Sequence, residues 1–191
     1  MDFFNYNTKL SLQTGRLLIS EPFLPDPNFE RTIVLICENN DKGTLGFVLN
    51  NPSTVKAKDV MDSLSNYHSP LLIGGPVQQN TLHYIHRKTH LKDAVEVGNG
   101  VFWSGNFEQL VSELETGKIN EKDIKFFFGY SGWERGQLEA ELELNSWIVS
   151  DMASKDLIFD TKPELMWKNT LAKMGGRFLM YSKYPLDPRL N

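Results

Sequence analysis

The whole chain is organised around one stretch, Phe126-Phe127-Phe128-Gly129-Tyr130-Ser131-Gly132-Trp133-Glu134-Arg135-Gly136-Gln137-Leu138-Glu139-Ala140-Glu141. It begins with apolar aromatic residues typical of a buried strand and ends in an acidic, amphipathic pattern typical of a helix. We expect its three glycines to break the strand and form an ordered corner, because glycine adopts positive φ at little cost. At least one glycine should have positive φ, with the ring of Tyr130 or Trp133 mostly buried. Such a corner can also aim backbone N–H groups at a ligand.

Short apolar and β-branched runs outside this stretch predict further strands. They cover residues 17–19, 32–37, 45–49, 71–73, 82–87, 101–103 and 147–149. Helices are expected over 57–64, where one would cover the hairpin of 32–37 and 45–49, from Asn106 to Gly117, and from Thr161 to Gly175. Asn106 and Gln109 have the spacing of a capping box. The tail, 178–191, is expected to be extended. Strands that do not alternate strictly with helices predict an α+β fold.

Length and composition predict one domain over residues 1–191. We divide it into a lead-in (1–14), a core (15–150), and a C-terminal helix with an extended tail (151–191). A chain of this length can bury a sizeable core. Cys37 is the only cysteine, so no intrachain disulfide can form, and a reducing cytoplasm is the expected location. No signal peptide and no membrane-spanning run is evident, so we expect no membrane association.

Charge argues against direct nucleic-acid binding. The formal net charge is −4, although residues 162–191 contain six basic groups against two acidic ones. That balance of +4 leaves −8 on the rest of the chain. Non-specific DNA affinity depends on basic groups that neutralise phosphates, and no segment combines a basic helix face with groove-reading side chains. A DNA-binding regulator is therefore the disfavoured alternative.

Several segments together resemble the bacterial YqgE/AlgH family over roughly residues 15–150. The matching segments are 15–20 with Pro22, Phe29 and Arg31; 35–40; 46–50 with Pro52; 74–77; 82–83; 129–133; 136–139; and 145–147. Each is weak alone, but their order and spacing are specific. The resemblance implies a bifurcated sheet, partly curled like a barrel and flanked by helices. The family carries the label of transcriptional regulator and is largely uncharacterised, so it implies no reaction.

Two positions depart from the family pattern. The family often has His where Asn39 stands and Arg where Asn51 stands. A family mechanism that relied on that imidazole or guanidinium could not operate in this chain.

Serine catalysis is not supported by the quoted stretch. Residues 129–133 can be compared with the G-x-S-x-G nucleophile elbow, but the second glycine would fall at Trp133. In that fold the catalytic histidine follows the serine, whereas all four histidines here precede Ser131. An anion held by Arg135 and the loop N–H groups is opposed by Glu139 and Glu141.

Metal and thiol chemistry are also disfavoured. His83, His86 and His90 have a spacing that would align on a helix, but the segment favours a strand, on which His83 and His86 face opposite ways. No cysteine or H-E-x-x-H pattern supports a metal, and we expect neither a metal nor a cofactor. Cys37 ends a buried strand beside Glu38, so a buried structural thiol is expected.

Two hypotheses about function remain open. The first is a non-catalytic binding or regulatory protein that acts through an unidentified protein or small molecule. Its predicted surface comprises Glu38, Asn50, Pro52, Gly74, Gly75, Pro76, Gly129, Tyr130, Ser131, Gly132, Trp133, Gly136, Gln137 and Glu139. The second is an enzyme of unrecognised class that uses Glu38, Ser131 and Glu139 in one cleft. Convergence of these three side chains in a concave pocket would separate the two.

Overall fold

The computed structural model describes residues 10–186. Its strands are β1 (Leu17–Ser20), β2 (Ile33–Asn40), β3 (Gly43–Val48), β4 (Leu72–Ile73), β5 (Val77–His86), β6 (Val95–Gly98), β7 (Val101–Trp103), β8 (Ile124–Glu134) and β9 (Trp147–Ser150). Its helices are α1 (Ala57–Val60), α2 (Phe107–Glu115), α3 (Gln137–Glu143), α4 (Pro163–Met174) and α5 (Gly176–Tyr181), with short helical segments η1 (Asp62–Leu64), η2 (Glu121–Asp123) and η3 (Asp156–Asp160). The fold is therefore α+β, as predicted.

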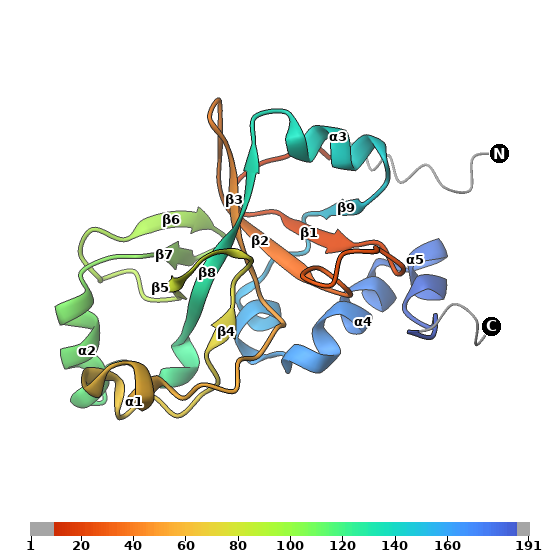
Figure 1. Cartoon of the computed structure of the whole chain (residues 1–191). Helices are drawn as coiled ribbons and strands as arrows, with labels where there is room; N and C mark the ends of the chain where they lie inside the picture. Colours follow the sequence, from red (N-terminus) through yellow and green to blue (C-terminus); the bar gives the residue numbers. More distant parts are fainter. Residues whose placement is uncertain (1–9, 187–191) are drawn as a thin grey trace.

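Strand β8 lies at the centre and belongs to both halves of the sheet (Figure 1). Its first half, residues 124–128, pairs antiparallel with β5 and parallel with β4. Its second half, residues 131–134, pairs antiparallel with β3, which continues through β2 and β1 to β9. The sheet is thus bifurcated, as the family resemblance implies. We call the projecting part built from β2, β3 and the end of β8 the arm.

The quoted stretch does not form a corner at its first two glycines, and the prediction of a broken strand was wrong. β8 passes through Gly129 and Gly132 and ends only at Glu134. Gly129 does have positive φ, 62°, and a Cβ there would lie 2.4 Å from the carbonyl oxygen of Val77. The residue is needed because two backbones approach closely where β8 changes partners. Gly136, with φ of 79°, makes the actual turn into α3.

The sheet curls but does not close into a barrel. Its two ends are β6 and β9. At Gly15, just before β1, a Cβ would lie 2.6 Å from the carbonyl oxygen of Val97 in β6, so β6 approaches the start of β1. One apolar core lies inside the curl, and Leu17, Phe127 and Met166 belong to it. Burial of such apolar surface is the main favourable contribution to folding.

Two further apolar clusters cover the outer faces. One joins α1 and α2 to β5 and the first half of β8 through residues such as Leu110 and Phe126. The other lies under α3 and contains Trp133, Leu138 and Trp147. Figure 1 shows α1 and α2 on one side, α4 and α5 on the other, and α3 beside the arm.

Three expectations about local structure were wrong. Residues 57–64 form only the short α1 and η1, and Ala57 and Leu64 pack in the cluster of α2 rather than over the β2–β3 hairpin. Residues 178–181 of the tail belong to α5 and are not extended. β6 was missed. Residues 1–9 of the lead-in and 187–191 of the tail lie outside the described residues. Across residues 10–186, no helix is both long and apolar enough to cross a membrane.

Candidate functional site

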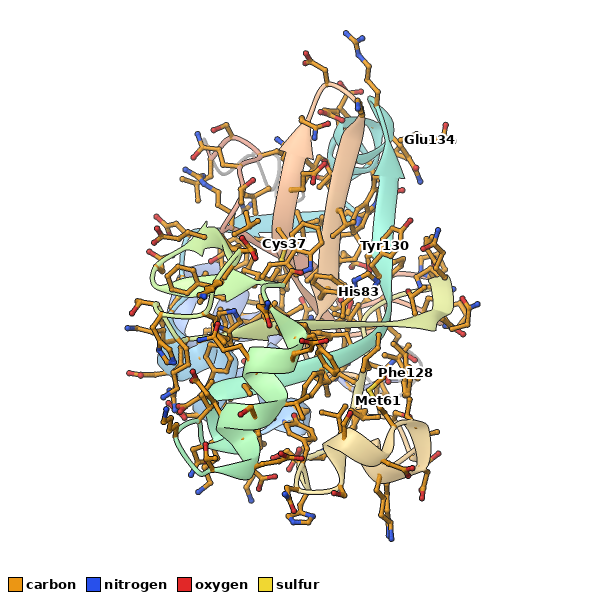
Figure 2. The ribbon with its side chains drawn as sticks, turned by 90° about the vertical axis from the view of Figure 1, so that its left-hand side faces the viewer. Cys37, Met61, His83, Phe128, Tyr130 and Glu134 are labelled. Carbon is orange, nitrogen blue, oxygen red and sulfur yellow. The ribbon has the colours of Figure 1, made fainter. Side chains whose placement is uncertain are left out.

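A concave pocket of about 520 Å³ lies on one face of the arm. We call it the arm pocket. Because side chains alternate along a strand, residues two apart share a face. Tyr130, Gly132 and Glu134 therefore lie on the pocket side of β8, beside Leu45 of β3 and Glu38 of β2. Figure 2 shows Tyr130 and Glu134 along the same strand, with Glu134 near its end.

The floor of the arm pocket is apolar. Leu45, Val77 and Tyr130 are half-buried and line it. Gly132 completes the floor for a steric reason, since a Cβ there would lie 3.1 Å from the Tyr130 ring. The missing side chain leaves room for the aromatic ring beside Gly132. Glycine here makes room for the floor and does not make a turn.

The rim of the arm pocket is charged. Glu38, Glu134 and Lys42 are exposed and line it. Within residues 10–186, neither carboxylate makes an ion pair, and that of Glu38 only accepts a 2.6 Å hydrogen bond from Asn40 Nδ2. Gln137 also lines the pocket and caps the end of β8, since its Oε1 accepts from the N–H of Glu134 at 3.0 Å. Two carboxylates thus stand over an apolar floor, and neither is paired with Lys42, the cation on the same rim.

His83 supports the floor from behind Tyr130. Its ring lies 5.8 Å from that of Tyr130 and 5.3 Å from that of Phe47, and its Nε2 is 2.9 Å from the Thr81 hydroxyl oxygen. Figure 2 places His83 next to Tyr130. Burial lowers the pKa of His83, so the neutral imidazole is favoured at neutral pH. From the sequence, His83 was considered only as a metal ligand, and its packing against Tyr130 and Phe47 was not predicted.

Five of the predicted surface residues meet in the arm pocket: Glu38, Tyr130, Gly132, Trp133 and Gln137. The Trp133 ring itself is buried on the opposite face, against Phe29 and Trp147. Positive φ at one glycine or more and burial of the Tyr130 or Trp133 ring were expected, and both are confirmed, since Gly129 and Gly136 have positive φ and the Trp133 ring is buried.

The other predicted residues are positioned elsewhere, and most hold the fold together. Asn50 joins two segments, because its Oδ1 accepts from the N–H of Ile33 and its Nδ2 donates to the carbonyl of Arg31, both at 2.9 Å. Gly74 and Gly75 lie directly against the backbone of β8. Pro52 bridges to Leu72, and the remaining positions, Pro76, Gly129, Gly136 and Glu139, do not line the arm pocket.

The three side chains of the enzyme hypothesis do not converge. Ser131 is fully buried on the face of β8 away from Glu38, and its hydroxyl donates to the carbonyl of Gly74 at 2.9 Å. Glu139 is exposed on α3 and lies outside the arm pocket. A serine that is sealed from solvent and already engaged as a donor cannot attack a substrate bound beside Glu38.

The histidines and the cysteine also take structural positions. His83 and His86 face opposite sides of β5, as expected, since the ring of His86 packs on Tyr84 and Phe102. In the described part of the chain, no group of three or more His, Cys, Asp and Glu residues could hold a metal ion. Cys37 is 3% exposed, and burial raises the pKa of its thiol well above the usual range.

Seven lining residues of the arm pocket were not among the predicted surface residues: Asn40, Lys42, Gly43, Thr44, Leu45, Val77 and Glu134. Glu134 could have been found from the alternation of side chains along a strand, because residues 130, 132 and 134 lie on one face. This alternation was hidden because the strand was expected to break at Gly129, so the faces beyond that residue could not be assigned.

Comparison with known proteins now adds the family. Residues 17–179 match the family described as DUF179, AlgH-like. A UPF0301 protein from Cytophaga hutchinsonii is 44% identical over 182 residues, covering 94% of this chain and all of the relative. One from Chlorobium limicola is 41% identical over 181 residues, covering 94% of this chain and 96% of the relative.

Two solved structures share the fold. The solution structure of the AlgH protein from Pseudomonas aeruginosa is 29% identical, with a TM-score of 0.71 over 90% of this chain and 94% of that one. A crystal structure of a protein from Corynebacterium diphtheriae has a TM-score of 0.78 at 21% identity, over 95% of this chain and 97% of that one. With a family match over most of its length and relatives above 40% identity, the chain belongs to the AlgH-like family of UPF0301 proteins.

Proposed function

We propose that the protein is a non-catalytic, cytoplasmic binding protein with a regulatory role, and that the arm pocket is where it takes its partner. The observation that supports this best is the combination of an apolar floor and two exposed carboxylates that form no ion pair within residues 10–186. Ligand sites in proteins combine apolar walls with a few polar groups that fix orientation. The single cysteine, Cys37, supports a reducing compartment.

The charges select the class of partner. Glu38 stands on β2 and Glu134 on β8, the two strands that flank β3 and its Leu45. Lys42 at the β2–β3 turn is the only basic residue that lines the pocket within residues 10–186. A partner segment with a basic side chain next to an apolar one would satisfy the carboxylates and cover the floor. We therefore propose a basic, partly apolar peptide segment of a partner protein as the occupant.

The test uses two short capped peptides with the sequences Arg-Tyr-Leu-Arg and Glu-Tyr-Leu-Glu, titrated into ¹⁵N-labelled protein. The basic peptide should shift the amide signals of Leu45, Tyr130 and Gly132 in a saturable way, and the acidic peptide should not. The paired substitution Glu38→Gln with Glu134→Gln should weaken binding roughly three- to tenfold, since exposed charge pairs contribute modestly.

Glu139→Gln is the matched control, because this carboxylate is exposed on α3 but outside the pocket. It should leave the affinity unchanged. Equal binding of both peptides, or shifts that map away from the arm pocket, would contradict the proposal.

A further inference from the structure

A second cavity, of about 390 Å³, lies at the start of β8, the opposite end of this strand from the arm. It forms where the start of β8 meets η2, η3 and the beginning of α4. Three lysines line it, Lys122, Lys125 and Lys162, and each comes from a different one of these segments or its edge. We call this cavity the lysine pocket.

The carboxylates at the lysine pocket already have partners other than these lysines. Oε2 of Glu121 accepts hydrogen bonds from the backbone N–H groups of His68, at 2.6 Å, and Ser69, at 3.1 Å. Both oxygens of Asp160 are bound by the guanidinium of Arg87, at 3.0 and 3.2 Å. The fork of Arg87 is the planar arrangement that suits a carboxylate. Among residues 10–186, none of the three lysines forms an ion pair with a carboxylate.

Lys125 is the central group of the three. It stands at the start of β8, is half-buried, and makes no ion pair or hydrogen bond through its ammonium within residues 10–186. Burial lowers its pKa, and the charge of Asp160 only partly opposes that shift. Its ammonium is not sealed from solvent, so water can hydrate it in the absence of a ligand. Lys125 lines the cavity, so an anion bound there can replace that water with a charge-assisted hydrogen bond.

The start of α4 adds to the positive character of the same cavity. Thr161, Lys162 and Pro163 line it, and the helix begins without a side-chain cap. The first N–H groups of a helix carry partial positive charge and favour anions. Glu164 in the first turn opposes this effect but does not line the cavity.

Apolar side chains form much of the remaining wall. Leu72, Phe159 and Pro163 line the cavity between the lysines. Apolar walls around a few charged groups are typical of sites for small organic molecules, and the volume lies in their usual range. We propose that the lysine pocket binds a small organic anion, with its phosphate or carboxylate group on Lys125 and its apolar part against Phe159 and Leu72.

The test titrates phenyl phosphate, benzoate and the uncharged benzyl alcohol separately into ¹⁵N-labelled protein. The two anions should bind saturably and shift the amides of Lys125, Thr161 and Lys162, whereas benzyl alcohol should not. The anions should also raise the pKa of the Lys125 ammonium, followed through its side-chain signals, because the bound anion stabilises the charged form. The stronger of the two anions identifies the group that is preferred.

Lys125→Met should weaken anion binding by about tenfold or more, since a charged hydrogen-bonding group is lost. Lys122→Met with Lys162→Met removes two exposed charges without touching the core and should weaken it by about threefold. Lys168→Met, on α4 but outside the cavity, is the control and should have no effect.

Three results would overturn the inference. They are equal binding of benzyl alcohol, unchanged affinity in both Lys125→Met and the paired variant, and no saturable shift with either anion. If Lys125→Met does not fold, the paired variant and the Lys125 pKa in the unmodified protein decide the outcome.

Discussion

The indole nitrogens of Trp133 and Trp147 donate hydrogen bonds to the same oxygen of Glu141, at 2.9 and 2.7 Å. The two rings meet edge to face, with centroids 5.8 Å apart. One carboxylate oxygen thus joins the end of β8, helix α3 and strand β9. Both indoles are buried, so each N–H depends on this oxygen as its acceptor.

Glu141→Ala should therefore lower the free energy of unfolding by about 2–4 kcal/mol, because two buried donors lose a charged acceptor. Glu141→Gln keeps one acceptor oxygen and should cost about 1–2 kcal/mol. Urea denaturation followed by tryptophan fluorescence measures both. Glu139→Gln, on the exposed side of the same helix, should change stability by less than about 0.5 kcal/mol. Equal losses for Glu139→Gln and Glu141→Ala would contradict the assignment.

Gly129→Ala should be more destabilising than Gly136→Ala. Both positions have positive φ, which costs a non-glycine residue about 1–2 kcal/mol. Only at Gly129 would the added Cβ also meet a backbone atom, the carbonyl oxygen of Val77, whereas Gly136 has open space around it. Chemical denaturation of the two variants gives the comparison. Similar losses would mean that close approach at Gly129 is unimportant.

Cys37 should react slowly with a thiol reagent in the folded protein and quickly after denaturation. Its side chain is buried, and burial raises the pKa of the thiol, so little reactive thiolate is present at neutral pH. Labelling with a chromogenic disulfide reagent, with and without denaturant, measures both rates. Rapid labelling of the native protein would point to a reactive thiol.

Stability should fall as the pH drops below about 6.5, the ordinary pKa of histidine. Burial lowers the pKa values of His83 and His86, so below that pH the unfolded chain takes up protons before the folded one does. The folded state loses relative stability until its own histidines protonate. Urea midpoints between pH 7.5 and 5 measure the slope, and His83→Gln should reduce it. An unchanged slope in that variant would exclude His83 as a source.

The protein should show no direct duplex DNA binding tighter than the non-specific range, about 10⁻⁴–10⁻⁶ M at physiological salt. The basic residues of 162–191 are joined to a body of net charge −8, and the two effects oppose each other within about a Debye length or two. A gel-shift titration measures this. A discrete, sequence-dependent complex at nanomolar protein would show that the family label of transcriptional regulator applies through DNA contact.

Features that depend on neighbouring residues could be predicted from the sequence. Asn106 was expected to cap a helix in a capping box with Gln109, and its side chain does accept from the Gln109 N–H at 2.8 Å. The reciprocal contact does not form, because the Asn106 N–H donates to the carbonyl of Lys92 and the Gln109 side chain accepts from the Lys92 N–H. The contact that does form needs only residues three apart. The strands around Leu18 and Ile148 were equally visible, because both are continuous apolar runs buried on each face.

Features that depend on contacts between distant segments could not be predicted from the sequence. Gly129 looks the same in a sequence whether it turns the chain or admits a second backbone, and only the position of Val77 decides between these. The lysine pocket has the same origin. Lys125 belongs to β8, Lys162 precedes α4, and nothing in the spacing of 37 positions between them indicates that they line one cavity.

Because β8 pairs with strands in both halves of the sheet, an error in its alignment affects both halves. In an ordinary edge strand, a slip by one residue disturbs a single ladder. A slip of β8 would misalign its pairing with β3, β4 and β5 together, and would bring residues with side chains opposite the glycines that allow close contact. Because β8 is shared, the pairing of strands in one half of the sheet fixes the alignment of strands in the other half.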